Sequence, residues 1–259
     1  MDALLELSSV GADAGGKARG LARLGELGLP VPRALVLPAD AHARWRASGS
    51  LDESDFRALA DALARLGPPL AVRSSATDED TAGRSAAGQY ESIMGIRDLP
   101  QLVQAVERCF RAAESERAVA YRGGRDARLA LVLQSEVRAD RAGVGFSIDP
   151  VRADANHVLL EVVFGHGEQV VSGEVAPDRY WVARDGSFVR ARLAEKSGVS
   201  PARRFMRTLR DDEARRVAEL VLHAEEGFGC PVDVEFCFAG SDLWLVQCRP
   251  ITTLGAQAA

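Results

Sequence analysis

The spacing of apolar residues predicts helices in the first part of the chain. Leu21, Leu24 and Leu27 recur at helical spacing and Gly28 would end the pattern, which predicts a helix over residues 17–28. Asp52 or Ser54 is a candidate N-cap for a helix predicted over residues 53–66. Further helices are predicted over residues 39–48, 53–66 and 99–120, and short strands over residues 34–37 and 70–72.

The pattern changes after the glycine-containing stretch at residues 122–126, which is the best candidate for a lobe boundary. Short apolar runs separated by turns predict strands over residues 129–134, 143–148, 157–163, 178–183, 187–193, 232–238 and 243–247. One helix is predicted among them, over residues 211–227. We therefore expect an α+β chain with a helix-rich lobe at 1–124, a strand-rich lobe at 125–259, and a ligand cleft between them.

Composition narrows the possible partners. The chain has 259 residues, 47% of them apolar, which is enough for a sizeable core. A net charge of -5 argues against nucleic acid, because phosphate backbones need a concentrated basic surface. Lys17 and Lys196 are the only lysines among the basic residues, so a lysine inside a glycine-rich segment stands out.

The cysteines and the apolar segments point to an intracellular protein. None of the four cysteines forms a C-x-x-C pair, so no zinc site is expected, and Cys237 and Cys248 should be buried. The start of the chain is not basic, and no apolar stretch has the length of a bilayer span. We expect no membrane association and a cytoplasmic location.

The segment GGKARG at residues 15–20 is the first candidate for chemistry. Glycines before a helix let backbone amides approach a phosphate, and the helix dipole favours the negative charge. Lys17 would add a point charge, although the spacing is not that of a P-loop. A flexible turn before a helix is the alternative interpretation.

The segment VRSSATDED at residues 72–80 follows a predicted buried strand. Arg73, at the end of that strand, would point its planar fork into a cleft, where it matches phosphate oxygens. The small and hydroxyl residues after it would suit a loop over a nucleotide. A solvated acidic loop fits the same residues.

Two strands near the end of the chain form the third candidate site. Polar and apolar residues alternate in DVEF at 233–236 and in LVQCRP at 245–250. If these strands form a hairpin, the side chains of Asp233, Glu235, Gln247 and Arg249 would share one face. A carboxylate beside an amide oxygen suits Mg²⁺, and an arginine there could hold a phosphoryl group. An ordinary half-exposed hairpin is the alternative.

Taken together, these segments resemble the N-terminal nucleotide-binding domain of the pyruvate phosphate dikinase, phosphoenolpyruvate synthase and rifampicin phosphotransferase family. The resemblance covers roughly residues 11–253. It rests on GGKARGLARLGELGLPVP, AVRSSATDED, AGQYES, AGVGFSIDP, GHGEQVVSGEVAPDRY and DVEFCFAGSDLWLVQCRPIT, in that order. It departs from the family pattern at Ala86, where phenylalanine is common, and at His166, where leucine is usual.

The resemblance implies an ATP-grasp-like fold with ATP and Mg²⁺ as ligands. It implies phosphate contacts for Lys17 and Arg73, a hydroxyl near the phosphates at Ser92, and an adenine-side position for Gln134. It also implies that Glu235 and Gln247 hold Mg²⁺ and phosphate and that Arg249 stabilises the phosphoryl group. The catalytic residues expected on this basis are Arg73, Glu235 and Arg249.

The resemblance also implies a partner. Family enzymes relay phosphate through a histidine on a separate swivelling domain, and none of the four histidines here has that sequence context. We therefore expect an ATP-dependent phosphotransferase component that is incomplete alone and acts with a phosphohistidine-bearing protein, giving AMP and phosphate. A regulatory nucleotide-binding module and a small-molecule kinase that releases ADP are the alternatives.

Overall fold

Two compact units make up the chain. The computed structural model describes residues 4–76, 92–121, 128–152, 154–165, 176–196 and 203–251. The first unit comprises Met1–Gly25 and Pro32–Glu136, and the second comprises Glu26–Val31 and Val137–Ala259. The first unit thus runs past the expected boundary at residues 124–125 and includes the strand Leu129–Ser135. The sequence could not predict this, because an apolar run shows that a strand is buried but not which sheet the strand joins.

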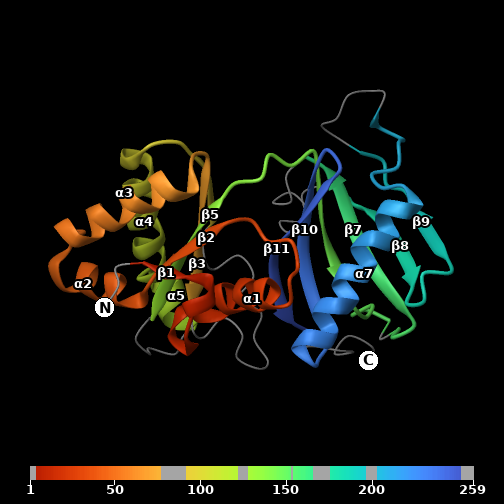
Figure 1. The fold of residues 1–259 in the computed structure, drawn as a ribbon, viewed down its shortest axis with the longest axis horizontal. Helices are drawn as coiled ribbons and strands as arrows, with labels where there is room; N and C mark the ends of the chain where they lie inside the picture. The colour runs from red at the N-terminus through yellow and green to blue at the C-terminus, as the bar shows by residue number, and fades with distance from the viewer. Residues whose placement is uncertain are drawn as a thin grey trace. The chain divides into compact units, whose positions relative to one another are not determined.

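The first unit is an antiparallel five-stranded sheet with helices on both faces. Its strands lie in the order β1-β2-β5-β3-β4. A core cluster joins Leu59, Phe110 and Leu131, which places α3 and α4 on one face of the sheet (Figure 1). The elements are β1 (Leu5–Glu6), η1 (Leu7–Ser9), η2 (Ala12–Ala14), α1 (Gly15–Glu26), β2 (Ala34–Leu37), α2 (Ala39–Ser48), α3 (Glu53–Leu66), β3 (Leu70–Ala76), β4 (Ser92–Ile96), α4 (Leu99–Ala113), α5 (Glu116–Tyr121) and β5 (Leu129–Ser135).

Local capping explains where these helices begin. Asp52 is the N-cap of α3, since its side chain accepts a hydrogen bond from the Asp55 amide at 2.9 Å and the Asp55 side chain accepts one from the Asp52 amide. The single helix expected over residues 99–120 is two helices. Ser115 separates them, and its hydroxyl accepts a hydrogen bond from the Ala118 amide at 3.3 Å.

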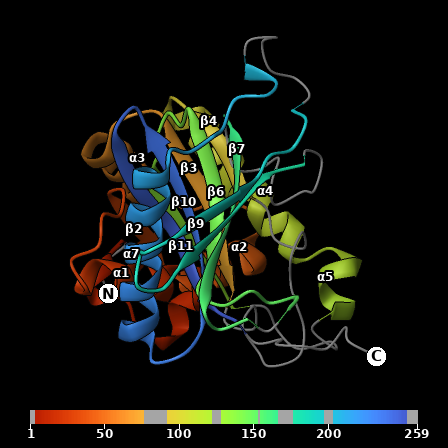
Figure 2. The ribbon, with the colours of Figure 1, turned by 90° about the vertical axis from the view of Figure 1, so that its right-hand side faces the viewer.

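The second unit is an antiparallel six-stranded sheet in the order β11-β10-β6-β7-β8-β9. Its long helix α7 packs closely on one face, because a Cβ on Gly145 of β6 would lie 2.7 Å from the Val221 side chain (Figure 2). The elements are β6 (Arg141–Phe146), β7 (His157–Phe164), β8 (Asp178–Ala183), β9 (Val189–Arg192), α7 (Asp211–Phe228), β10 (Val232–Ala239) and β11 (Asp242–Pro250). The α+β class and the strands expected in this part of the chain are confirmed.

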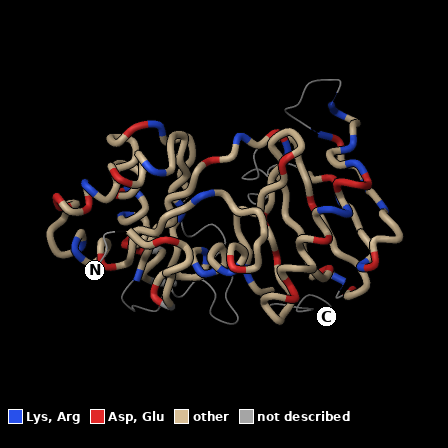
Figure 3. Tube along the Cα trace, in the orientation of Figure 1, with Lys and Arg blue, Asp and Glu red and all other residues tan. Residues whose placement is uncertain are grey.

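Charged residues of both signs are mixed along both units. Figure 3 shows Lys and Arg interspersed with Asp and Glu over the traced parts of the chain. No helix among the described residues has the length and apolarity that crossing a membrane requires.

Candidate functional site

Three of the polar residues on the central strands of the first sheet share one face. Leu70 and Val72 of β3 point into the core beneath the helices, so the alternating residues Arg73 and Ser75 point to the opposite face. The antiparallel register pairs Ala71 with Gln134 of β5, which places Gln134 on that same face. The sheet therefore presents an arginine, a serine and an amide together, away from the main core.

The first turn of α1 is fixed to this face by Ser75. The fully buried Ser75 hydroxyl accepts a hydrogen bond from the Ala18 amide at 3.1 Å and donates one to the Ala14 carbonyl at 2.7 Å. Gly15 has φ +80°, and a Cβ there would lie 2.3 Å from the Ser75 carbonyl oxygen. The structure thus brings together the GGKARG and VRSSA segments, and it places the half-buried Lys17 in the first turn of the helix that Ser75 holds.

Gln134 and Ser92 occupy different surroundings on this sheet. Gln134 is 3% exposed, and its Nε2 has no hydrogen-bond partner among the described residues. A buried amide donor of this kind fits a ring nitrogen acceptor such as those of adenine. Ser92 is the cross-strand neighbour of Arg73 and is exposed, so its hydroxyl lies on the strand next to the guanidinium.

The hairpin expected in the second unit is present, and its register is set by an irregularity. Phe236 pairs with Leu245, whereas the preceding residue Glu235 pairs with Gln247, so Val246 is the extra residue of a β-bulge. Without the bulge, Gln247 would pair with the buried Val234 and face the α7 side of the sheet. The bulge therefore places Gln247 beside Glu235.

Asp233 and Arg249 form the next cross-strand pair on the same face of this hairpin. The Arg249 Nε donates to both carboxylate oxygens of Asp233, at 2.9 and 2.7 Å, and Asp233 is 7% exposed. An ion pair at Nε fixes the plane of the guanidinium, which directs its two Nη groups. The sequence indicated the shared face of Asp233 but gave it no role, because alternation cannot show which polar neighbours bond.

Glu235 and Gln247 offer two oxygen donors of the kind that Mg²⁺ prefers. One half-buried carboxylate and one buried amide lie opposite each other across the two strands. Within the described ranges, no group of three or more His, Cys, Asp or Glu side chains could hold a metal. Two oxygen ligands match the way Mg²⁺ is usually held, with substrate phosphates and waters completing six positions.

Cys248, one of the two cysteines of this hairpin, is not a reactive group. Cys248 is buried, and burial, together with the nearby Asp233 carboxylate, raises the pKa of its thiol. A thiol that stays protonated is neither a good nucleophile nor a good metal ligand. Cys248 and Cys237 are therefore buried apolar side chains, as expected from the sequence.

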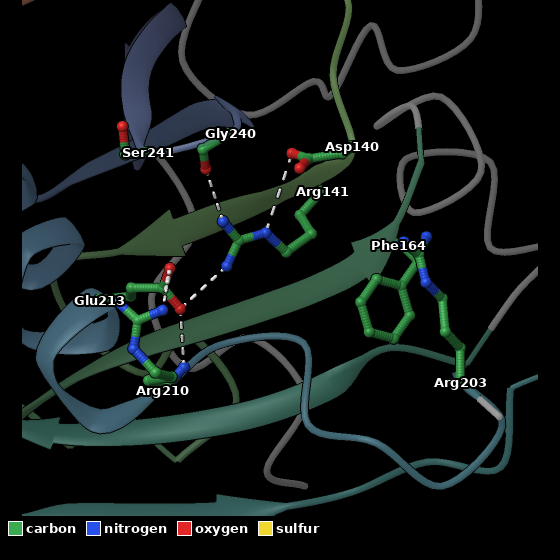
Figure 4. Close-up of a pocket in the computed structure, with 8 residues that line it drawn as sticks. All are labelled: Asp140, Arg141, Phe164, Arg203, Arg210, Glu213, Gly240 and Ser241. Atoms are coloured by element: carbon green, nitrogen blue, oxygen red, sulfur yellow. Dashed lines mark hydrogen bonds and ion pairs between the residues drawn. The ribbon is translucent and has the colours of Figure 1, made fainter.

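A cavity of about 330 Å³ lies elsewhere in the second unit (Figure 4). On one side Arg141 bonds Glu213 at 2.9 Å and the Gly240 carbonyl at 2.9 Å, and on the other Arg203 lies over the Phe164 ring. The side chain of Arg141 thus connects the β10–β11 turn to the start of α7. The residues that line the cavity include none of the predicted site residues; they are Asp140, Arg141, Phe164, Arg203, Arg210, Glu213, Gly240 and Ser241.

Three segments singled out in the sequence lie outside the described residues. They are the loop at 77–91, which includes Ala86, the candidate lobe boundary at 122–126, and the glycine-containing segment at 166–175, which includes His166. The remaining predicted site residues lie in two separate groups. One group is on β3, β4, β5 and α1 of the first unit, and the other is on the β10–β11 hairpin of the second.

Comparison with known proteins identifies relatives over nearly the whole chain. The chain is 31% identical to a probable phosphoenolpyruvate synthase of Methanocaldococcus jannaschii, over 96% of the chain and 26% of that protein. It is 35% identical to a rifampicin phosphotransferase of Streptomyces sviceus, over 76% of the chain and 25% of that protein. The chain thus spans about a quarter of the length of these relatives.

A model of a protein family shows which family the chain belongs to. Among solved structures, a D-alanine–D-alanine ligase from Bacillus anthracis complexed with ATP has a TM-score of 0.46 and 12% identity, covering 94% of this chain and 57% of that one. That similarity is too low to support a conclusion, so the assignment rests on sequence. The model described as pyruvate phosphate dikinase, AMP/ATP-binding domain, matches residues 53–259. In agreement with the resemblance of its sequence segments, the chain belongs to the pyruvate phosphate dikinase AMP/ATP-binding domain family.

Proposed function

We propose that this chain binds Mg-ATP and transfers phosphoryl groups to a histidine on a separate partner protein, in dikinase-type chemistry. In this chemistry the histidine nitrogen would attack the β-phosphorus of ATP, the bond from that phosphorus to the oxygen shared with the α-phosphate would break, and AMP would leave. Water would then hydrolyse the pyrophosphohistidine to phosphohistidine and phosphate. The observation that carries the proposal is the bulged hairpin register, which pairs Glu235 with Gln247 and Asp233 with Arg249 on one face.

The second unit would supply the metal and the transfer chemistry. Glu235 and Gln247 would hold Mg²⁺ through oxygen, and a bound Mg²⁺ would neutralise charge on the phosphate oxygens. Arg249, fixed at Nε by Asp233, would direct its Nη groups at the phosphoryl group in transit. These contacts stabilise charge that develops during transfer, and the nucleophile would come from the partner's histidine.

The first unit would bind the nucleotide. The buried Gln134 amide would donate to an adenine nitrogen, and Lys17 and Arg73 would contact phosphate oxygens. The Ser92 hydroxyl would add a contact beside Arg73. A cytoplasmic location is consistent with these substrates and remains part of the proposal.

Mg-ATP should raise the melting temperature of the purified chain by roughly 5–10 °C at a hundred times its dissociation constant, since such binding stabilises by about 2.7 kcal/mol. Differential scanning fluorimetry with Mg-ATP and with ATP plus EDTA measures the shift and its dependence on the metal. Glu235→Ala should remove the Mg²⁺-dependent part of the shift.

The matched control is Glu219→Ala, which removes an exposed carboxylate from α7 on the other side of the same sheet and should leave the shift unchanged. Nucleotide analysis after addition of a histidine domain from a dikinase-family enzyme then tests the chemistry. AMP with phosphate supports the proposal, whereas ADP alone would indicate a small-molecule kinase. Intact ATP with every histidine domain tried would indicate a binding module, and the proposed chemistry would be rejected.

A further inference from the structure

Ser75 joins two segments that are far apart in the sequence and that we propose contact the phosphates of ATP. Its hydroxyl bonds Ala14 and Ala18, which are 61 and 57 residues away along the chain, on either side of the Gly15–Lys17 turn. Arg73 precedes it by two residues and lies on the same face of the same strand. One side chain therefore connects the turn that carries Lys17 to the strand that carries Arg73.

We infer that Ser75 is a positioning residue, which holds Lys17 and Arg73 at a fixed separation for the phosphates of ATP. The inference rests on the proposed function. The Ala18 amide is among the first four of α1, which have no partner inside their own helix, so the serine supplies an acceptor that the helix lacks. The same hydroxyl donates its proton to the carbonyl on the other side of the turn.

The energetic reason lies in the glycines. Gly15 and Gly16 lose more conformational freedom on ordering than any other residue type, and a turn made of them would not hold a neighbouring lysine in place unaided. Two cationic side chains bind a polyphosphate more tightly when they are already held in place, because ordering them at binding costs free energy. The close approach of Gly15 to Ser75, where a Cβ would lie 2.5 Å from the hydroxyl oxygen, shows that the contact has no room for a larger residue.

Ser75→Ala provides the test, and the adjacent serine provides the control. Ser75→Ala should raise the dissociation constant of Mg-ATP roughly three- to tenfold while leaving that of adenosine unchanged, as measured by titration calorimetry. Ser74 is also buried, at 1% exposure, but its side chain lies on the opposite face of the sheet. Its hydroxyl has no hydrogen-bond partner within the described ranges. Ser74→Ala should therefore leave both constants unchanged.

Two further variants keep the test decisive. Ser75→Cys keeps a substituent on Cβ but replaces the hydroxyl with a larger and only weakly bonding thiol, so it should show the same selective loss for ATP if the alanine variant does not fold. Gly15→Ala keeps the serine but forces the turn away, and it should also weaken ATP more than adenosine.

The outcomes separate this inference from the proposed function. If the wild-type chain does not bind ATP, the proposed function fails and the inference fails with it. If the wild-type chain binds ATP and Ser75→Ala binds it equally well, only the inference is overturned. Equal losses for ATP and adenosine would likewise overturn it, because they would show a general structural role with no effect specific to the phosphates.

Discussion

Arg249→Ala should lower the rate of AMP formation at least about 1000-fold, because an arginine that stabilises a phosphoryl group in transit is worth roughly 10³–10⁵ in rate. ATP binding should fall much less, since Lys17, Arg73 and Gln134 would still hold the nucleotide. The measurement is AMP release with a dikinase-type histidine domain supplied in trans, alongside the ATP-induced melting shift. Arg249→Lys should not restore the rate, because a lysine lacks the rigid planar fork in which Nε bonds Asp233 while the two Nη groups face the phosphate.

Two variants separate the role of Arg249 from a general effect of removing charge. Asp233→Asn keeps the shape of the ion-pair partner but weakens the bond at Nε, so it should give a smaller loss of rate with nearly unchanged ATP binding. Arg216→Ala removes an exposed arginine of α7 whose Nη1 bonds the Ser241 carbonyl, and it should change the rate less than twofold. An Arg249→Ala variant that makes AMP at the wild-type rate would exclude Arg249 from the transfer step.

The sequence predicted the local elements well because each carries its own signal. The helix Glu53–Leu66 has the expected limits since an aspartate precedes it and a glycine follows it. The alternation in DVEF and QCRP placed four polar side chains on one face, which the hairpin register confirms. Both signals depend only on residues close together in the chain.

Features that depend on distant residues could not be predicted. The bulge at Val246 sets the pairing of Gln247, yet valine has no property that marks a bulge. Ser75 looked like any small residue in VRSSA, since the sequence does not show that its partners lie at residues 14 and 18. The strand β4 was not predicted, because its residues SIMGI include an exposed serine, an exposed methionine and a glycine.

Lys196 shows the same limitation, because nothing near it in the sequence distinguishes it from a surface residue. Its side chain is 3% exposed and bonds Asp178, which is fully buried, at 2.8 Å. Asp178 also accepts hydrogen bonds from the Ala194 and Thr208 amides and from the Thr208 hydroxyl. One carboxylate thus holds the chain after β9 and the chain before α7 against the sheet of the second unit.

Lys196→Met should destabilise the chain by roughly 3–5 kcal/mol, because removing one partner of a buried pair leaves the other charge uncompensated. The measurement is the free energy of unfolding in urea, supported by a fall in melting temperature of about 10 °C. Lys196→Met combined with Asp178→Asn should recover part of the loss, since the second change removes the stranded charge.

Arg204→Met is the matched control for this prediction, because Arg204 pairs with Glu195 next to Lys196 but both of those side chains are more than half exposed. An exposed pair contributes at most about 1 kcal/mol, so this variant should be nearly as stable as the wild type. Equal losses for Lys196→Met and Arg204→Met would show that burial does not set the strength of the lysine pair. A double variant less stable than Lys196→Met would show that Asp178 acts mainly through its amide and hydroxyl donors, which an asparagine satisfies less well.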